Sequence, residues 1–547
     1  MPPKIRDQFQ KLVKSSRVVP SLSHYLRFVS NIPHHLEHQV NSRSFSDSWR
    51  SGEFPGSFDN LHRYFDYTMQ NRDRLFYQYA LLNLGIVQSD FGCHKEAVAT
   101  MLEAISTAKE NRDTTCLNFA LNWFFHFSRA HPNLVKELED NSMLGSGKES
   151  LAFLRAKAKE TGMWILWSSA LLSEAKLGLA NGESISAALE SMVRSSQIIV
   201  EKNVKTMIGP QLSLSIALWD RLGMAAMSTM TCEVFLRCHA RSSVFDDQLK
   251  LTCRMAGMLA GKGMYEEAFA KLEAVDTNSL RSAKPDQYWH LYRGLLKLRR
   301  DLHHNNLDSA EALLSQLLQN TPEDIEPDMV YIIDALHLET LTRRQDYSAA
   351  FTKVDRLIAE LREGNRDSAL RIRLLLIKAH LLDRVGRPEK GFTIAMRAAG
   401  MAWRARLGAL LWQAVGALAN ILNALGEFAA AERLLLAVLP RCLETEVAYS
   451  AGTLYSLLAD ARVGLLGEMR GLDKEEEERE RVKMVGSIHK TLDAAFRYFS
   501  VVEDVEKRCE MMAKKAALYR AEGDFVRAEG CADSYLTLWD EELARKG

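Results

Sequence analysis

A short phrase, glycine–x–aromatic–x–x–alanine, recurs along this chain of 547 residues and constrains its fold more than any other feature. The clearest copies are Gly263–Tyr265–Ala268, Gly426–Phe428–Ala431 and Gly523–Phe525–Ala528. Weaker copies begin at Gly182, Gly223, Asn305, Gln345 and Gly386. From 182 to 426 the first positions lie 41, 40, 42, 40, 41 and 40 residues apart. Such a period predicts a solenoid, because each unit buries its apolar face only against the next unit.

The phrase itself predicts a corner between two antiparallel helices. Glycine ends the first helix without a Cβ penalty, the aromatic residue fills the corner, and only a small residue lets the second helix approach closely. This pattern is typical of the tetratricopeptide repeat rather than the HEAT repeat, and an upstream copy from Gly92 to Ala97 fits it. Because the period exceeds the usual length of about 34 residues, we expect long hairpins in a wide superhelix. The fold class predicted is an all-α, right-handed solenoid, suited to a platform.

Composition supports a helical protein without a strong electrostatic field. The chain is 47% hydrophobic and has only 12 prolines, while 70 basic and 70 acidic residues cancel. This balance argues against nucleic acid or an anionic membrane as partner. The eight cysteines form no C-x-x-C pair, which predicts small buried residues in the reducing cytosol or nucleus. Residues 407–426 carry no charge, but their position in the repeat predicts a buried first helix rather than a membrane span.

The domain organisation follows from where the repeats begin. Residues 1–60 contain prolines and a serine-rich run, so we expect an N-terminal helical remnant and linker there. The superhelix is expected over 61–547, with a degenerate unit around 117–140. A surplus of residues before Gly523 coincides with a charged stretch near 471–485, which we expect to be a solvated insertion.

The sequence contains no motif for catalysis or for a cofactor. Phosphate-binding loops, zinc-protease motifs and nucleophile elbows are all missing, so we expect neither an enzyme nor a small-molecule substrate. The histidines His34, His35 and His38 have no matching acidic or thiol ligands, and we predict no metal. Lys250 and Arg254 match part of a clamp for a peptide carboxylate, although a surface basic pair is the simpler interpretation. Cys232, Cys238 and His239 share one helical stretch, for which we predict buried packing.

The segment around the first repeat is more specific than the rest of the chain. It combines a hydrophobic–His–x–Tyr–Phe–Asp run, a Tyr–Ala–x–Leu–Asn–Leu helix and the glycine corner, followed by Glu103–Asn111, Asp113 and Cys116–Leu117. The residues that carry the first two elements are Leu61, His62, Tyr64, Phe65, Tyr79, Ala80, Leu82, Asn83 and Leu84. In this order and spacing, the segment resembles the family of anaphase-promoting complex subunit 5.

The resemblance implies a non-catalytic platform subunit of a ubiquitin ligase that controls mitosis in the nucleus and cytoplasm. Its implied partners are the large scaffold subunits one and four and neighbouring tetratricopeptide subunits. Members of the family usually carry a sizeable helical domain before this motif, so we expect this chain to be shortened at its start. The alternative is a tetratricopeptide adaptor of another class, a co-chaperone or a motor light chain, that binds a peptide.

Overall fold

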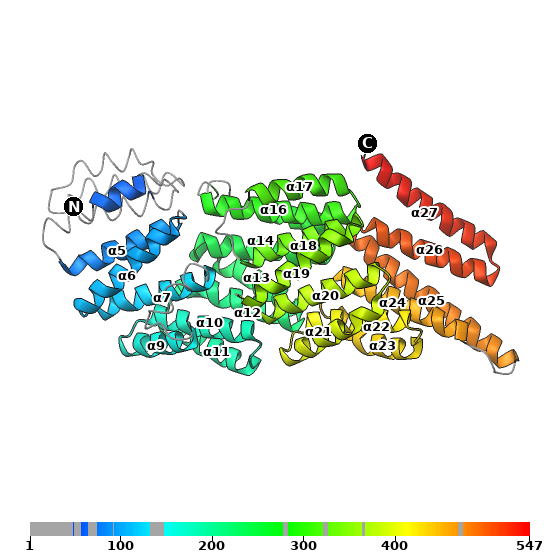
Figure 1. Ribbon diagram of the computed structural model, residues 1–547, viewed down its shortest axis with the longest axis horizontal. Coiled ribbons are helices and arrows are strands. Elements are labelled where there is room, and N and C mark those ends of the chain that lie inside the picture. The colour runs from blue at the N-terminus through cyan, green and yellow to red at the C-terminus, as the bar shows by residue number, and fades with distance from the viewer. Residues whose placement is uncertain are drawn as a thin grey trace. The chain divides into compact units, whose positions relative to one another are not determined.

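The computed structural model describes ten stretches of the chain (Figure 1). They are residues 48, 56–63, 74–90, 92–131, 147–276, 280, 283–320, 327–363, 367–468 and 474–546. Within these stretches the regular structure is entirely helical, and consecutive helices pack as antiparallel pairs. The predicted fold class, an all-α solenoid of the tetratricopeptide type, is confirmed.

The chain divides into two compact units. Unit 1 comprises residues 1–170 and 275–288, and unit 2 comprises residues 171–274 and 289–547. Two of the three boundaries fall inside helices, α10 (Trp164–Asn181) and α16 (Ala283–His303), and the third lies between residues 274 and 275. Unit 1 also contains the helical residues 56–63 and the helices α5 (Arg74–Asp90), α6 (His94–Glu110), α7 (Thr114–Ala130) and α9 (Gly147–Glu160).

Unit 2 continues the same pairing of helices to the end of the chain. Its first part contains α11 (Ile185–Glu201), α12 (Ile208–Leu222), α13 (Ala225–Val234), α14 (Phe245–Gly261) and α15 (Tyr265–Glu273). Its second part contains α17 (Leu307–Asn320), α18 (Pro327–Arg343), α19 (Tyr347–Glu363), α20 (Ser368–Arg384), α21 (Phe392–Arg404) and α22 (Gly408–Ala424). The last helices are α23 (Phe428–Leu443), α24 (Ala448–Glu468), α25 (Lys474–Val502), α26 (Val505–Glu522) and α27 (Phe525–Lys546).

The first residue of each phrase ends a helix with a positive φ. The residues in this conformation at these corners are Gly92, Gly182, Gly223, Gly263, Asn305, Gln345, Gly386, Gly426 and Gly523. At Gly263 two backbone bonds close the helix end: Gly263 N–H donates to the Ala260 carbonyl, and Met264 N–H donates to the Leu259 carbonyl. This is the Schellman arrangement, which satisfies carbonyls that the helix leaves unpaired.

The small residue of the phrase lies one turn into the second helix and is buried there. Ala97, Ala268 and Ala431 are all fully buried. The copy at Gly182 differs, because the sequence pairs this glycine with Ala187, which is exposed, whereas Ala188 is the buried residue. Helix α11 begins three residues after its glycine instead of two, so every position of that copy shifts by one.

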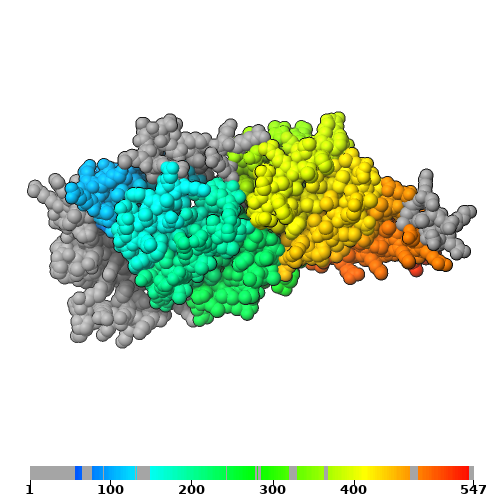
Figure 2. All heavy atoms as spheres, turned by 90° about the horizontal axis from the view of Figure 1, so that it is seen from below, coloured from blue at the N-terminus to red at the C-terminus, as the bar shows by residue number. Residues whose placement is uncertain are grey.

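Within unit 2 the corners of early helix pairs lie against corners that occur much later in the chain. The carbonyl of Leu222 and the backbone of Gly408 approach so closely that a Cβ on Gly408 would lie less than 3.0 Å from the Leu222 oxygen. A Cβ on Gly263 would meet the Val501 carbonyl equally closely. We call this arrangement the stacked edge. Figure 2 agrees with it, since green and yellow parts of unit 2 abut on the face shown.

Side chains complete the stacked edge. Asp367 lies 3.4 Å from Arg221, the Ser368 hydroxyl donates to the carbonyl of Ala180 over 3.2 Å, and Lys262 pairs with Glu446 at 2.5 Å. The expectation that each repeat contacts only its sequence neighbours is therefore wrong for unit 2. Early corners of unit 2 are thus in direct contact with corners that occur much later in its sequence.

Several sequence expectations concern residues that lie wholly or partly outside the described stretches. The triple-histidine segment, Tyr64, Phe65 and most of residues 1–60 lie outside them, as do residues 132–140 of the expected degenerate unit and residues 469–473. The charged stretch near 471–485 overlaps the start of α25, where residues 478–483 are exposed. This helix and α24 have 29 and 21 residues and are longer than most others, so the surplus residues extend this hairpin.

The cysteines only partly match the expectation of buried residues. None of the eight, all of which the structure describes, forms a disulfide, and five of them are buried: Cys116, Cys232, Cys253, Cys442 and Cys509. Cys93 and Cys238 are exposed, because Cys93 lies at a corner and Cys238 lies on the outer side of the π-helical turn Phe235–His239 that follows α13. Residues 408–424 form α22, with a buried face, and across the described ranges no helix is long and apolar enough to cross a bilayer.

Candidate functional site

The aromatic residues of the three clearest phrases differ in their surroundings. Tyr265 is 2% exposed and lies beside His303 on α16, the first helix of the following pair, with their ring centroids 6.3 Å apart. Phe428 packs against α24 at Gly464, where a Cβ would collide with its ring. Phe525 is 67% exposed, and Ala528 is half-buried. Tyr265 and Phe428 thus pack on the first helix of the following pair.

The family-like motif of unit 1 contributes residues to two neighbouring apolar clusters. Leu61 packs with Ala80 and Val87, and Leu84 lies against them, while His62 is exposed. Leu82 belongs to the neighbouring cluster, with Met101 and Cys116. Tyr79 and Asn83 are half-buried. These residues hold α5 to the helices on either side of it.

A polar corner in unit 1 explains the aspartate, Asp113, that follows the motif. Asp113 caps α7 by accepting hydrogen bonds from the backbone N–H groups of Thr115 and Cys116, at 3.0 and 3.1 Å. Its second carboxylate oxygen accepts from Gln78 over 2.9 Å, and Gln78 in turn accepts from Asn111 over 2.7 Å. Burial by itself would raise the pKa of Asp113, but these hydrogen bonds outweigh it and lower the pKa. Gln78 is buried and was not singled out from the sequence.

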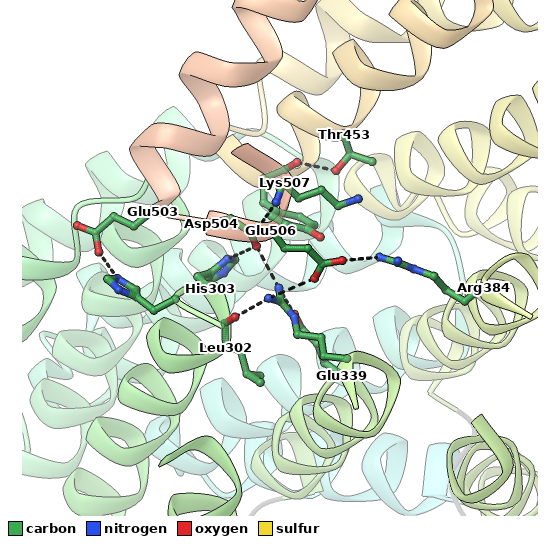
Figure 3. Close-up of polar contacts among 12 residues, drawn as sticks. Leu302, His303, Glu339, Arg384, Thr453, Glu503, Asp504, Glu506 and Lys507 are labelled. Atoms are coloured by element: carbon green, nitrogen blue, oxygen red, sulfur yellow. Dashed lines mark hydrogen bonds and ion pairs between the residues drawn. The ribbon is translucent and has the colours of Figure 1, made fainter. Parts of the chain in front are cut away.

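A polar group of eight residues lies at and around the start of α26 in unit 2, and we call it the α26 cluster (Figure 3). Its acidic members lie at the α25–α26 corner and in the first turn of α26. Its basic members lie on α16, α18 and α20, except His304, which directly follows α16. The members are Glu503, Asp504, Glu506, Arg300, His303, His304, Arg343 and Arg384. It therefore joins one late corner to three earlier helix pairs.

Asp504 lies at the centre of this cluster and is fully buried. It accepts from His303 Nδ1 at 2.9 Å and from the Arg343 guanidinium at 3.0 Å, and it also caps α26 at the Lys507 N–H. Burial would raise the pKa of Asp504, but the His303 hydrogen bond and the Arg343 charge lower it to about 2. The carboxylate is thus ionised and paired at neutral pH.

Arg343 makes the widest set of contacts in the cluster. Its side chain is 8% exposed, and besides Asp504 it contacts Glu339 at 3.1 Å and Glu506 at 3.8 Å. It also donates to the carbonyl of Leu302 at the end of α16. Although burial disfavours a charged guanidinium, the surrounding carboxylates raise the pKa of Arg343. A buried charge needs such complete pairing, because its desolvation is costly.

The outer part of the cluster is closer to solvent. Glu503 accepts from His304 over 2.6 Å and from Arg300 over 3.2 Å, and these hydrogen bonds outweigh burial to lower its pKa. Glu506 lies 3.6 Å from Arg384 on the opposite side. Figure 3 shows Glu503 and Arg384 at the two ends of the cluster, with Asp504 and Glu506 between them.

The chemistry of these groups is structural rather than reactive. The charges of the α26 cluster satisfy one another, and in the part of the chain that the structure describes no group of His, Cys, Asp and Glu is placed to hold a metal ion. Arg254, one of the two candidate clamp residues, pairs with Asp220 at 3.3 Å. The predicted burial of Cys232 holds, but Cys238 is exposed. Sequence reasoning missed the α26 cluster, since hydrogen-bonded members such as Arg300 and Glu503 are separated by 203 residues.

Comparison with known proteins points to one family. Residues 42–131 match the family model described as anaphase-promoting complex subunit 5. The curated protein of that name from Schizosaccharomyces pombe is 32% identical over 251 residues. The resemblance to the family of anaphase-promoting complex subunit 5 is therefore confirmed. The matched region contains the motif at 61–84 and the polar corner around Asp113.

The extent of these matches is limited. The alignment with the S. pombe protein covers 45% of this chain and 32% of that protein, so the matched part spans about a third of the relative's length. Among solved structures, BtubC from P. vanneervenii is similar with 16% identity and a TM-score of 0.30, over 46% of this chain and 91% of that chain. A signal transduction ATPase with a tetratricopeptide repeat sensor from Pyrococcus horikoshii has 14% identity and a TM-score of 0.35, over 80% of this chain and 72% of that chain.

Proposed function

We propose that this chain is a non-catalytic structural subunit of the anaphase-promoting complex, the ubiquitin ligase of the matched family. The observation that carries the proposal is the match of residues 42–131 to subunit 5, together with 32% identity over 251 residues to the S. pombe protein of that name. The proposed role is to hold other subunits in place, among them the large scaffold subunits one and four and neighbouring tetratricopeptide subunits. The proposed location is the nucleus and cytoplasm.

The stacked edge supports a platform rather than a peptide clamp. A clamp uses convergent donors on an open inner surface. Here the corners at Gly182, Gly223 and Gly263 are occupied by later parts of unit 2, and the α26 cluster ties four helix pairs together. A unit joined at its own edges holds its outer helices in fixed relative positions, which is what a scaffold requires.

Depletion followed by complementation tests the proposal. A degron fused to this chain in its own cells should, after induction, reduce the amount of intact ligase that sediments as one particle and stabilise mitotic substrates. Re-expression of the chain should restore both. Purified chain alone should transfer no ubiquitin when supplied with activating and conjugating enzymes. Normal substrate turnover after depletion, with the tagged chain bound to a chaperone or a motor instead, would favour the adaptor alternative.

A further inference from the structure

The outer surface of α13 differs from that of the other second helices of unit 2. All five exposed residues between 224 and 234 are apolar: Met224, Ala226, Met227, Met230 and Val234. We call this set the α13 face. Met230 is 63% exposed and Met227 is 45% exposed. An exposed apolar group of this kind is unusual on a soluble helix and marks an interaction site more often than single exposed residues do.

The fold does not require this surface. The opposite side of α13 is already packed, because Cys232 and the following Phe235 lie in a buried cluster with Ile216 and Leu251. The next second helix, α15, occupies the same position in its pair, yet it exposes Glu266, Glu267, Lys271 and Glu273. Since α13 and α15 pack in the same way within their pairs, packing does not explain why the exposed residues of the α13 face are all apolar.

The spacing of the α13 face indicates the shape of its partner. Met224, Met227, Met230 and Val234 follow one another at intervals of three, three and four residues, which forms a stripe along one side of a helix. The stripe extends about 15 Å at 1.5 Å per residue, or about three turns. Methionine side chains adapt their shape to a partner, and a stripe of this size fits the apolar side of an amphipathic helix.

The charges at the end of the stripe indicate which residues the partner carries there. Arg237 is 79% exposed and Arg241 is exposed, both beyond the last apolar residue. Arg237 lies 3.2 Å from Glu233, but such an exposed pair contributes little and can be exchanged for a better one. Acidic residues on the partner would therefore be complementary at this end, with guanidinium groups suited to bidentate contacts with carboxylates.

We propose that the α13 face binds an amphipathic α-helical segment of another subunit, about three turns long, with acidic residues beside Arg237 and Arg241. This inference rests on the proposed function, since it describes one partner contact of the assembled ligase. It adds the surface on this chain and the chemistry of the segment that occupies it.

The test compares two variants in tagged, full-length chain expressed in its own cells. The first carries Met227→Glu and Met230→Glu. The matched control carries Met396→Glu and Leu436→Glu, at positions 51% and 46% exposed on the second helices α21 and α23. All four sites are on the surface, so thermal unfolding should match wild type in both variants. Each co-purified subunit is quantified by mass spectrometry.

We expect the first variant to lose one subunit at least tenfold while the control keeps it. A photo-crosslinker in place of Met230 should then link to a segment of that subunit with apolar residues three to four apart and adjacent acidic residues. Arg237→Glu with Arg241→Glu should weaken retention of the same subunit, and more strongly at low salt.

The outcomes separate the two proposals. If wild type retains the ligase subunits and the first variant retains all of them equally, the α13 face is not a docking site, although the proposed function stands. A crosslink only to a second copy of this chain, or only to lipid, also overturns the inference. If wild-type chain brings down no ligase subunit, the proposed function itself fails.

Discussion

The corner at Gly263 gives the most direct test of the stacked edge, and Gly426 is its matched control. Both glycines end a first helix with nearly the same φ, 90° and 85°. Alanine in this conformation costs about 1–2 kcal/mol at either site. At Gly263 the new Cβ would also meet the Val501 carbonyl and side chain at less than 3.0 Å, whereas at Gly426 no described atom beyond the neighbouring residues lies within 4 Å.

Relieving the contact at Gly263 requires backbone of the α25–α26 corner to move. Overpacking of this kind costs about 1–3 kcal/mol more. We therefore expect Gly263→Ala to destabilise unit 2 by about 2–5 kcal/mol and Gly426→Ala by about 1–2 kcal/mol, adding the two contributions.

Hydrogen–deuterium exchange is the suitable assay, because a chain of this size need not unfold in one step. Peptides from residues 497–510 should exchange faster in Gly263→Ala, although they are distant in sequence, and remain protected in Gly426→Ala. Thermal melting supplies the overall stability. Equal losses of stability in both variants, with unchanged exchange at 497–510, would refute the stacked edge.

Three further predictions concern the same contacts. Asp504→Asn keeps a residue that can cap α26 but leaves Arg343 without its buried partner, and should cost about 3 kcal/mol in chemical denaturation at pH 7. The pKa of Asp504 is about 2 instead of 3.8. Its carboxylate therefore contributes about 2 kcal/mol of stability, which is present above pH ~4 and is lost as the pH falls toward 2. The stabilities of wild type and Asp504→Asn should converge near pH ~2, and a constant difference between them throughout an acid titration would contradict this. Ala268→Leu and Ala431→Leu should each cost about 1–3 kcal/mol, but exchange mapping should show spread to the α25–α26 corner only for Ala268→Leu.

The corners could be predicted from the sequence because their cause is local. A helix end with positive φ favours glycine or asparagine, and a closely packed helix start favours alanine. Each corner therefore produces a recognisable sequence pattern within six residues. Asn305 fits this rule at a weak copy, and its φ is 54°. The one-residue error at Ala187 has a local cause too, since the phrase at Gly182 has an extra residue before its helix begins.

The stacked edge and the α26 cluster could not be predicted in this way. Which corners meet depends on the rotation between successive helix pairs, summed over several repeats, and no short motif encodes that sum. Gly408 illustrates the difficulty: it begins a helix, where glycine has no local advantage, and only the nearby Leu222 carbonyl explains it. Asp504 similarly reads as an ordinary helix cap, although it is also the partner of Arg343.

Glycine at the first position of the repeated phrase therefore has two physical causes in this chain. At Gly386, Gly426 and Gly523 the positive φ is sufficient, since among the described residues nothing lies close to a Cβ there. At Gly263 the conformation and the approach of Val501 act together. A solenoid whose repeats contact only their neighbours would use the first cause alone. The second cause couples distant repeats, so strain introduced at one early corner reaches the α25–α26 corner directly, without passing through the repeats between them.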